Sequence, residues 1–188
     1  MNKTILYAKN TNDLISLLKN NQGSEIVGGC TIIEELPAKA VSTYNIPELC
    51  QITRHERYID VGPGCTLSSI LDIGQNHLPP ILYEALKSIA NPIIRNMATI
   101  GGNICYKGNK LTLFAPLMAL EAKLEFKNSS ETKYESIRNF KQVPQDFILH
   151  NIRIPLVDAD LSIFRRIGHE HAINQQSASF AFLATTEK

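Results

Sequence analysis

The stretch Asn91-Pro-Ile-Ile-Arg95-Asn96-Met-Ala-Thr99-Ile-Gly101-Gly102-Asn103 carries most of the information about the fold. Its Asn-Pro predicts the end of a preceding helix, because a proline disfavours helical geometry in the residue before it. A polar turn is expected next, followed by a Gly-Gly beside a hydroxyl and an amide. A second Gly-Gly lies upstream, in Gly28-Gly29-Cys30-Thr31-Ile32. Two such corners suggest a phosphate-rich ligand held by backbone N–H groups, since glycine lets the backbone approach an anion closely.

Each glycine corner has a simpler interpretation as an ordinary tight turn. Gly28-Gly29 belongs to neither a G-x-G-x-x-G fingerprint nor a phosphate-binding loop of the Gly-Lys-Ser/Thr type. The second corner adds the hydroxyl of Thr99 and the amide of Asn103, which suit the phosphates and ribose of a dinucleotide. A surface turn carrying Arg95 is the alternative there. Together the corners leave a dinucleotide site and two ordinary turns as open alternatives.

The rest of the chain predicts a mixture of helices and strands. Apolar patterning indicates strands within 4–8, 24–27, 40–44, 58–61, 122–126 and 148–155, with another from residue 164. Capping residues and apolar stripes predict helices after Asn10 or Thr11, after Thr66, from Pro79 and over 113–120. The apolar tail 177–183 needs a surface to pack against. Because no long βαβα alternation runs through the chain, the predicted fold class is α+β.

Composition narrows the classes of partner. The 188 residues are 44% apolar, which suits one compact unit or two small subdomains. With 19 basic and 18 acidic residues, the net charge of +1 gives no reason to expect nucleic acid or an anionic membrane as a partner. No apolar run approaches the ~18–20 residues that span a bilayer. The polar N-terminus does not resemble a secretory signal, so a cytoplasmic location is expected.

Neither the cysteines nor the histidines indicate a reactive or metal site. The four cysteines form no C-x-x-C pair and have no basic cluster beside them, so free, buried thiols are expected. They are Cys30, Cys50, Cys65 and Cys105. His169-Glu-His171 would face one way only on a strand and lacks a third ligand nearby, which favours surface histidines. No Ser/His/Asp arrangement or acid–base pair of carboxylates is visible.

The two glycine segments resemble a known family. Val27-Gly-Gly-Cys-Thr31 and Ile93-Ile-Arg-Asn-Met-Ala-Thr-Ile-Gly-Gly-Asn103 are similar to the FAD-binding subunit of molybdenum hydroxylases, the medium subunit of the xanthine dehydrogenase and carbon monoxide dehydrogenase type. Supporting similarities follow in the family's order along nearly the whole chain. They lie in residues 58–70, 79–90, 115–120, 152–155 and 164–168.

This resemblance implies an α+β FAD-binding domain of two subdomains, the type shared with vanillyl-alcohol oxidase and molybdopterin dehydrogenases. Residues 1–54 would form a small β-α-β subdomain, 55–157 a second subdomain, and 158–188 the remnant of a truncated C-terminal domain. FAD would lie between the subdomains. The implied function is electron transfer from an iron–sulfur subunit to an acceptor, while a molybdopterin subunit hydroxylates the substrate.

The resemblance also assigns site residues by position. The first phosphate loop would comprise Gly28, Gly29, Cys30, Thr31 and Ile32, and the second Arg95, Thr99, Ile100, Gly101, Gly102 and Asn103. Thr112 stands where the family has an acidic FAD ligand, and threonine lacks a carboxylate's charge-assisted acceptor. Lys107 and Lys110 are candidates to meet phosphate as point charges.

Two other functions remain open at this stage. One is a non-catalytic scaffold or interaction subunit that keeps the fold but binds FAD weakly or has lost it. The other is an independent flavoenzyme of the same superfold, although no acid–base group that would face a substrate is visible. Homodimerisation would be one way to compensate for the short C-terminal segment.

Overall fold

The computed structural model of the protein describes residues 3–44, 46–108, 110–168 and 177–186. Its elements are mixed along the chain, and they confirm the predicted α+β class. In chain order they are β1 (Thr4–Tyr7), α1 (Thr11–Asn20), β2 (Glu25–Val27), β3 (Lys39–Ser42), η1 (Pro47–Cys50), β4 (Ile52–Arg54), β5 (Tyr58–Val61), α2 (Leu67–Leu71), η2 (Gln75–His77), α3 (Pro80–Lys87), α4 (Pro92–Arg95), α5 (Ile100–Ile104), α6 (Phe114–Ala119), β6 (Lys123–Lys127), β7 (Thr132–Ser136), β8 (Ile148–Pro155), β9 (Leu161–Ile167) and β10 (Ala178–Ala184).

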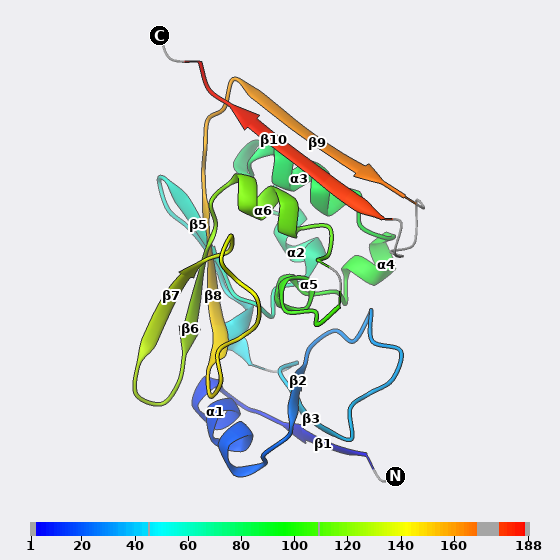
Figure 1. The fold of residues 1–188 in the computed structure, drawn as a ribbon, viewed down its shortest axis with the longest axis vertical. Coiled ribbons are helices and arrows are strands. Elements are labelled where there is room, and N and C mark those ends of the chain that lie inside the picture. Colours follow the sequence, from blue (N-terminus) through cyan, green and yellow to red (C-terminus); the bar gives the residue numbers. More distant parts are fainter. Residues whose placement is uncertain (1–2, 45, 109, 169–176, 187–188) are drawn as a thin grey trace.

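The N-terminal part is a three-stranded parallel sheet in the order β1-β3-β2, packed with helix α1 (Figure 1). The helix starts as predicted, because the side chain of Asn10 accepts a hydrogen bond from the backbone N–H of Asp13 at 2.8 Å. Leu14 of the helix and Val41 of β3 are almost fully buried and share a small apolar cluster. The segment that follows β2, which ends at Val27, therefore starts at the edge of this unit and lies against residues 97–99.

A five-stranded antiparallel sheet in the order β4-β5-β8-β6-β7 forms the central layer. Its strands alternate buried and less buried residues, as expected for a sheet with one face packed on a core. Strand β8 is the central strand and pairs with β5 on one side and β6 on the other. The β6–β8 register shifts between Glu125 and Phe126, which marks a β-bulge.

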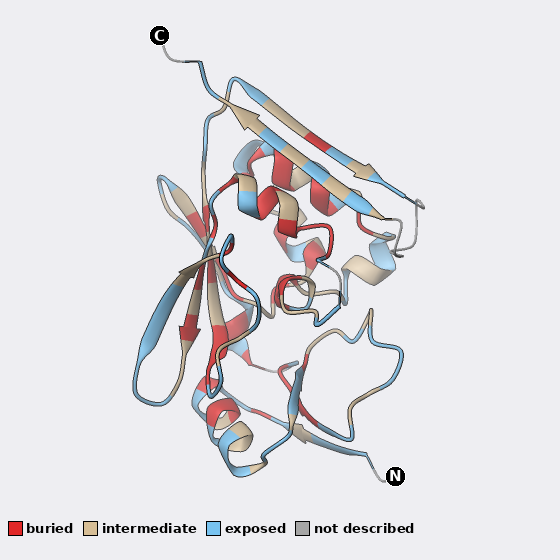
Figure 2. Ribbon diagram, in the orientation of Figure 1, coloured by how far each residue is buried: buried red, intermediate tan, exposed pale blue. Residues whose placement is uncertain are grey.

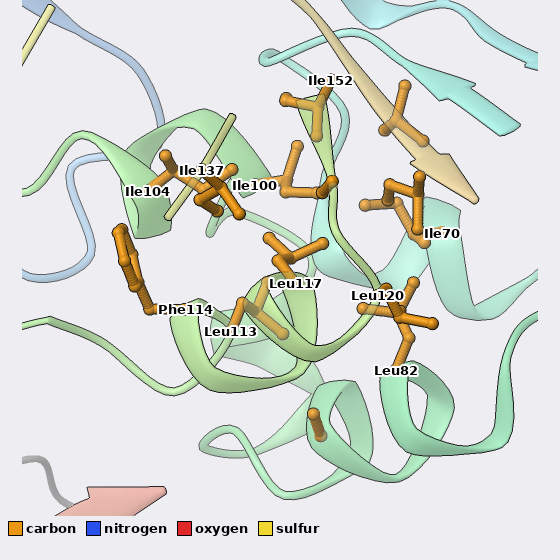
Figure 3. Close-up of a cluster of buried hydrophobic side chains, with 14 of the residues drawn as sticks. Ile70, Leu82, Ile100, Ile104, Leu113, Phe114, Leu117, Leu120, Ile137 and Ile152 are labelled. Carbon is orange, nitrogen blue, oxygen red and sulfur yellow. The ribbon is translucent and has the colours of Figure 1, made fainter. Parts of the chain in front are cut away.

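Short helices cover the inner face of this sheet, and the main core lies between them (Figure 3). The helices α2, α3, α5 and α6 and the strands β5, β6 and β8 all contribute fully buried side chains. The buried core side chains labelled in the figure, some of them in the connections between these elements, are Ile70, Leu82, Ile100, Ile104, Leu113, Phe114, Leu117, Leu120, Ile137 and Ile152. Figure 2 shows the same concentration of buried residues on the helices and the middle of the sheet.

The antiparallel hairpin β9–β10 lies over helices α3 and α6, on the side away from the five-stranded sheet (Figure 1). Phe164 of β9 is buried in the main core, and Ala181 and Leu183 of β10 pack against it. The apolar tail therefore has the packing surface that its sequence requires. The outward-facing side chains of β10 remain exposed, among them Phe180 and Phe182.

Several local features differ from the sequence predictions. Strands β4 and β7 were not predicted, because both are short and β7 is largely polar. Asn91-Pro92 does more than end a helix: Asn91 accepts a hydrogen bond from the N–H of Ile94 and caps the additional short helix α4. The preceding helix α3 ends at Lys87, and Ala90, just before Asn91, adopts a left-handed φ of 46°. His169 and His171 lie outside the described residues.

Candidate functional site

The two glycine segments, far apart in sequence, are in direct contact. A Cβ atom on Gly29 would overlap the backbone carbonyl of Met97. A Cβ atom on Gly28 would lie 3.3 Å from the Oγ1 atom of Thr99. We call residues 28–32 the first glycine loop and residues 95–103 the second glycine loop. The close approach explains why glycine is needed at position 29, since any side chain would force the loops apart.

The first glycine loop presents unpaired backbone donors. Among the described residues, no acceptor pairs with the backbone N–H groups of Gly28, Gly29, Cys30, Thr31 and Ile32. Cys30 has a left-handed φ of 53°, and its thiol donates to the carbonyl oxygen of Gly28 at 3.3 Å. Successive free N–H groups in a loop that includes a left-handed residue can form an anion-binding concavity.

The second glycine loop is different, because its backbone N–H groups, apart from that of Thr99, have acceptors within the described part of the protein. The Gly-Gly pair lies in the short helix α5 and not in a turn, and Thr99 caps this helix by accepting from the N–H of Gly102 at 3.1 Å. The N–H groups of Ile100 and Gly101 donate to the carbonyl oxygens of Cys65 and Pro63, at 3.0 and 2.9 Å. This loop therefore forms part of the wall of the site, whereas the free donors belong to the first glycine loop.

The two loops border a cleft of about 600 Å³. Most of its lining is apolar, with contributions from α1, α2 and β8 besides the loops. Nine of the twelve site residues predicted from sequence line it: Gly28, Gly29, Cys30, Thr31, Ile32, Thr99, Gly101, Gly102 and Asn103. The volume falls within the range of roughly 300–1,000 Å³ typical of ligand and cofactor pockets.

Arg95 is not in the cleft lining, and its guanidinium has another role. Its Nη1 atom donates to the carbonyl oxygens of Lys87, Ile89 and Ala90, at 3.3, 2.7 and 3.1 Å. These carbonyls end the helix before the second glycine loop, where a cation is favourable. Arg95 therefore holds the loop in position and is committed away from a phosphate in the cleft.

Ile100 and Thr112 are also outside the cleft lining. Ile100 is fully buried in the main core, where it anchors helix α5. Thr112 is only 4% exposed and is not among the residues that line the cleft. A carboxylate at position 112 would be buried, and the substitution Thr112→Asp would destabilise the fold unless the charge found a partner.

Asn103 has a double role. Its side-chain Oδ1 atom accepts a hydrogen bond from the backbone N–H of Leu113 at 3.1 Å, which ties the second glycine loop to the start of helix α6. The residue also lines the cleft, so its amide N–H₂ group is the part that can serve a ligand.

Sequence reasoning missed two polar residues of the cleft, Glu25 and Tyr106. Lys107, which was expected to meet phosphate as a point charge, also lines the cleft and forms an ion pair with Glu25 at 2.5 Å. Its partner in β2 is 82 positions away in sequence, so no local pattern could have indicated the pair.

The cysteines are free, as expected, but two of them are exposed. Cys30 is in the first glycine loop and Cys50 is at the end of η1, whereas Cys65 is buried and Cys105 is intermediate. Burial raises the pKa of Cys65 to about 11 and that of Cys105 to about 12, so both are protonated at neutral pH. The expectation of four buried thiols was therefore wrong for Cys30 and Cys50, which are exposed at a loop and at a helix end.

Comparison with known proteins identifies the family. The family described as "FAD binding domain in molybdopterin dehydrogenase" matches residues 1–157. The chain belongs to this family. Its glycine loops and the cleft between them lie entirely within the matched region. The resemblance inferred from the glycine motifs is thereby confirmed.

Individual relatives agree with this membership. The chain is 33% identical over 142 residues to the xanthine dehydrogenase FAD-binding subunit of Escherichia coli O157:H7, covering 70% of this chain and 48% of that protein. It is 25% identical over 150 residues to abscisic-aldehyde oxidase of Arabidopsis thaliana, covering 74% of this chain and 11% of that protein. The chain thus spans about half the length of the bacterial relative.

Solved structures show the same fold. A chain of the Cu,Mo-CO dehydrogenase in its cyanide-inactivated form superposes with a TM-score of 0.81 at 20% identity, covering 92% of this chain and 67% of that one. Quinoline 2-oxidoreductase from Pseudomonas putida 86 gives a TM-score of 0.76 at 17% identity, covering 91% and 65%. These matches confirm the predicted FAD-binding fold.

Proposed function

We propose that this chain binds FAD in the cleft between its glycine loops and serves as the electron-transfer subunit of a molybdenum hydroxylase complex. The observation that carries the proposal is the row of free backbone N–H groups in the first glycine loop, beside a cleft of about 600 Å³. Free N–H groups in succession suit the diphosphate of a dinucleotide. Membership of the FAD-binding family supports FAD as that dinucleotide.

Residues of both loops would hold the cofactor. The first glycine loop would donate hydrogen bonds to the diphosphate, and the side chains of Thr99 and Asn103 would lie beside it as polar lining. The apolar walls, which include Leu14, Leu67 and Leu149, would exclude water from a flat aromatic ring system. When bound, FAD supplies the capacity to accept and release electrons, and the protein supplies binding, orientation and local electrostatics.

The proposed partners follow from the relatives. One relative is named as the FAD-binding subunit of xanthine dehydrogenase, which implies other subunits in that enzyme. By this likeness, an iron–sulfur subunit would deliver electrons to the chain and a molybdopterin subunit would hydroxylate the substrate. We place the complex in the cytoplasm. In the part of the chain that the structure describes, no helix is long and apolar enough to cross a membrane.

We also propose a division into units at residues 1–54, 55–157 and 158–188. Separate sheets support it, because the three-stranded sheet, the five-stranded sheet and the hairpin follow one another along the chain. Strand β4 (Ile52–Arg54) precedes the first boundary in sequence but pairs with β5 of the second unit. The end of the first unit would therefore contribute a strand to the sheet of the second.

A scaffold that has lost FAD is the second candidate function. Two observations favour it. The guanidinium of Arg95 is bonded to backbone carbonyl oxygens and Thr112 is buried, so neither side chain is available for the contact with the cofactor that was expected of it. Under this hypothesis the chain would keep its fold and its contacts with partner subunits, and the cleft would have no role in electron transfer.

An FAD titration of the purified chain separates the two functions. Saturable binding, read by flavin absorbance, should raise the melting temperature by about 5–10 °C at a hundredfold excess of FAD over the dissociation constant. Riboflavin, which lacks the diphosphate, is the matched ligand and should bind more weakly. No saturation and no thermal shift at high FAD concentration would reject the FAD-binding function and leave the scaffold hypothesis.

A further inference from the structure

The cleft contains a single pair of opposite charges. Among the described residues that line it, Glu25 and Lys107 are the only ones with charged side chains. They come from segments far apart in the sequence, Glu25 from strand β2 and Lys107 from the segment that follows helix α5. Their side chains meet at 2.5 Å. The ion pair therefore bridges the two parts of the protein that border the cleft, and leaves the lining with no net charge.

A diphosphate changes this balance. A dinucleotide such as FAD carries about two negative charges in its diphosphate, and the free N–H groups of the first glycine loop supply only partial positive charges. Lys107 is the one cation of the described lining that can approach the diphosphate. Its side chain is 80% exposed and that of Glu25 is 46% exposed, so the pair is weak and screened and its exchange for another anion requires little reorganisation.

We propose that Lys107 is a positioning residue for the cofactor diphosphate, and that it exchanges its ion pair with Glu25 for a phosphate oxygen when the ligand binds. Glu25 acts as the competitor that holds Lys107 in the ligand-free protein and repels anions of low affinity. This inference rests on the proposed FAD function. It adds a charge-exchange step and names the phosphate groups as the part of the ligand that the step recognises.

The exchange predicts opposite effects for the two partners. Removal of the lysine charge in Lys107→Met should weaken FAD binding by about tenfold, the low end for loss of a hydrogen bond to a charged group. Lys107→Arg retains the charge and should bind FAD within about threefold of the wild type. Glu25→Gln removes the competitor and should tighten binding by a few-fold, in the range expected of an exposed ion pair.

The experiment is an FAD titration of the full chain and these variants at about 20 and 500 mM salt. Lys133→Met is the matched control, because it also removes one positive charge and breaks an exposed ion pair, with Glu131, but lies outside the cleft lining. Wild-type affinity should fall with salt, and this salt dependence should be weaker in Lys107→Met. Circular dichroism confirms that each variant folds.

The outcomes distinguish this inference from the proposed FAD-binding function. If the wild type binds FAD, and Lys107→Met binds it with the same affinity and the same salt dependence, only the role of Lys107 would be overturned. Equal weakening in Lys107→Met and Lys133→Met would also overturn it, since the effect would then be that of net charge. Failure of the wild type to bind FAD would overturn the proposed function and this inference together.

Discussion

Gly29 and Met97 touch backbone to backbone, although 68 positions separate them, and a Cβ atom on Gly29 would overlap the Met97 carbonyl oxygen. This contact brings the first glycine loop, which holds the row of free N–H groups, against the second glycine loop, where all N–H groups but that of Thr99 are already paired. The glycine at position 29 is thus required by the neighbouring segment of protein, independently of any ligand. A clash with backbone cannot be relieved by a side-chain rotation.

Gly29→Ala should therefore separate the loops and destabilise the protein even without FAD. We expect a loss of about 1–3 kcal/mol in the free energy of unfolding, the usual range for an overpacked site. Urea denaturation of the ligand-free protein measures it. Gly28→Ala is the matched control, because the nearest atom to its new Cβ is the Thr99 hydroxyl oxygen at 3.3 Å, which belongs to a side chain. Equal stability of both variants would contradict the role of the Gly29–Met97 contact.

Gly101→Val tests whether this glycine serves a ligand or the fold. The resemblance assigns Gly101 to the second phosphate loop, where an added side chain would occupy the space of a diphosphate. In the structure, a Cβ atom on Gly101 would lie 2.6 Å from Cβ and 2.7 Å from the carbonyl oxygen of Pro63. We therefore expect Gly101→Val to lower the melting temperature in the absence of FAD. Gly102→Ala provides the comparison. Its new Cβ atom would contact only the Thr99 hydroxyl oxygen, at 3.1 Å, so it should lower the melting temperature less. An unchanged melting temperature with lost FAD binding would restore the ligand explanation.

Arg95→Met should destabilise the connection between helix α3 and the second glycine loop. The variant loses three hydrogen bonds from one guanidinium nitrogen to backbone carbonyl oxygens. Because the donor is charged and half-buried, we expect a loss of about 1–2 kcal/mol, measured by chemical denaturation. Arg95→Lys should recover part of it, since an ammonium group supplies charge without the planar fork. If Arg95→Met left stability unchanged but weakened FAD binding, the guanidinium would have to serve the ligand after all.

Acid should destabilise the protein through Asp60. Partial burial raises the pKa of its carboxyl. Hydrogen bonds from Arg153 and Asn151 and the charge of Arg153 together lower this pKa by more, so it is below its usual value. Arg153 binds both oxygens of Asp60, each at 2.9 Å. A depressed folded-state pKa stabilises the protein above the unfolded value, near 3.9, and that contribution is lost as the pH falls through the folded value.

The measurement is the melting temperature between pH 2.5 and 7. Asp60→Asn should be less stable than the wild type at neutral pH, and its stability should fall less below about pH 4. Glu121→Gln, which breaks the exposed pair with Arg138, serves as the control and should keep the slope of the wild type. An acid slope in Asp60→Asn as steep as that of the wild type would rule out Asp60 as its source.

Thiol labelling should report occupancy of the cleft. At pH 8, a small alkylating reagent should modify Cys30 and Cys50 before Cys65 and Cys105, because the first two are exposed and the pKa values of the others are raised to about 11 and 12. Saturating FAD should slow labelling of Cys30, which lines the cleft, and leave Cys50 unchanged. Mass spectrometry of peptides separates the four sites. Equal rates at Cys30 with and without bound FAD would place the ligand elsewhere.

Much of the fold was predictable because its local signals agree with the packing. Asn10 and Thr66 cap helices as their sequence context indicates, and the apolar stripe of 81–89 is buried. The polar strand β7 escaped prediction because it is an edge strand, and such strands carry little apolar alternation. Helix α5 was read as a turn because two consecutive glycines disfavour a helix, and tertiary hydrogen bonds to Pro63 and Cys65 override that preference.

The candidate site was predictable as a set of residues, but not in its division of labour. The Gly-Gly motifs identified both loops, and the structure brings them together at Gly29 and Met97. Which loop keeps its N–H groups free depends on partners such as Pro63, distant in sequence from the first motif. The ion pair between Glu25 and Lys107 likewise depends on the relative placement of two units, and no local pattern encodes it.

Two adjacent residues of strand β8 belong to different apolar clusters, so this strand connects the two clusters. Ile148 packs in the small cluster beneath helix α1, and the next residue, Leu149, packs in the main core and also lines the cleft. Separation of the N-terminal sheet would therefore pull on the central strand of the larger sheet. We therefore expect the N-terminal sheet and the five-stranded sheet to melt together in one cooperative transition, and a ligand bound in the cleft to stabilise both.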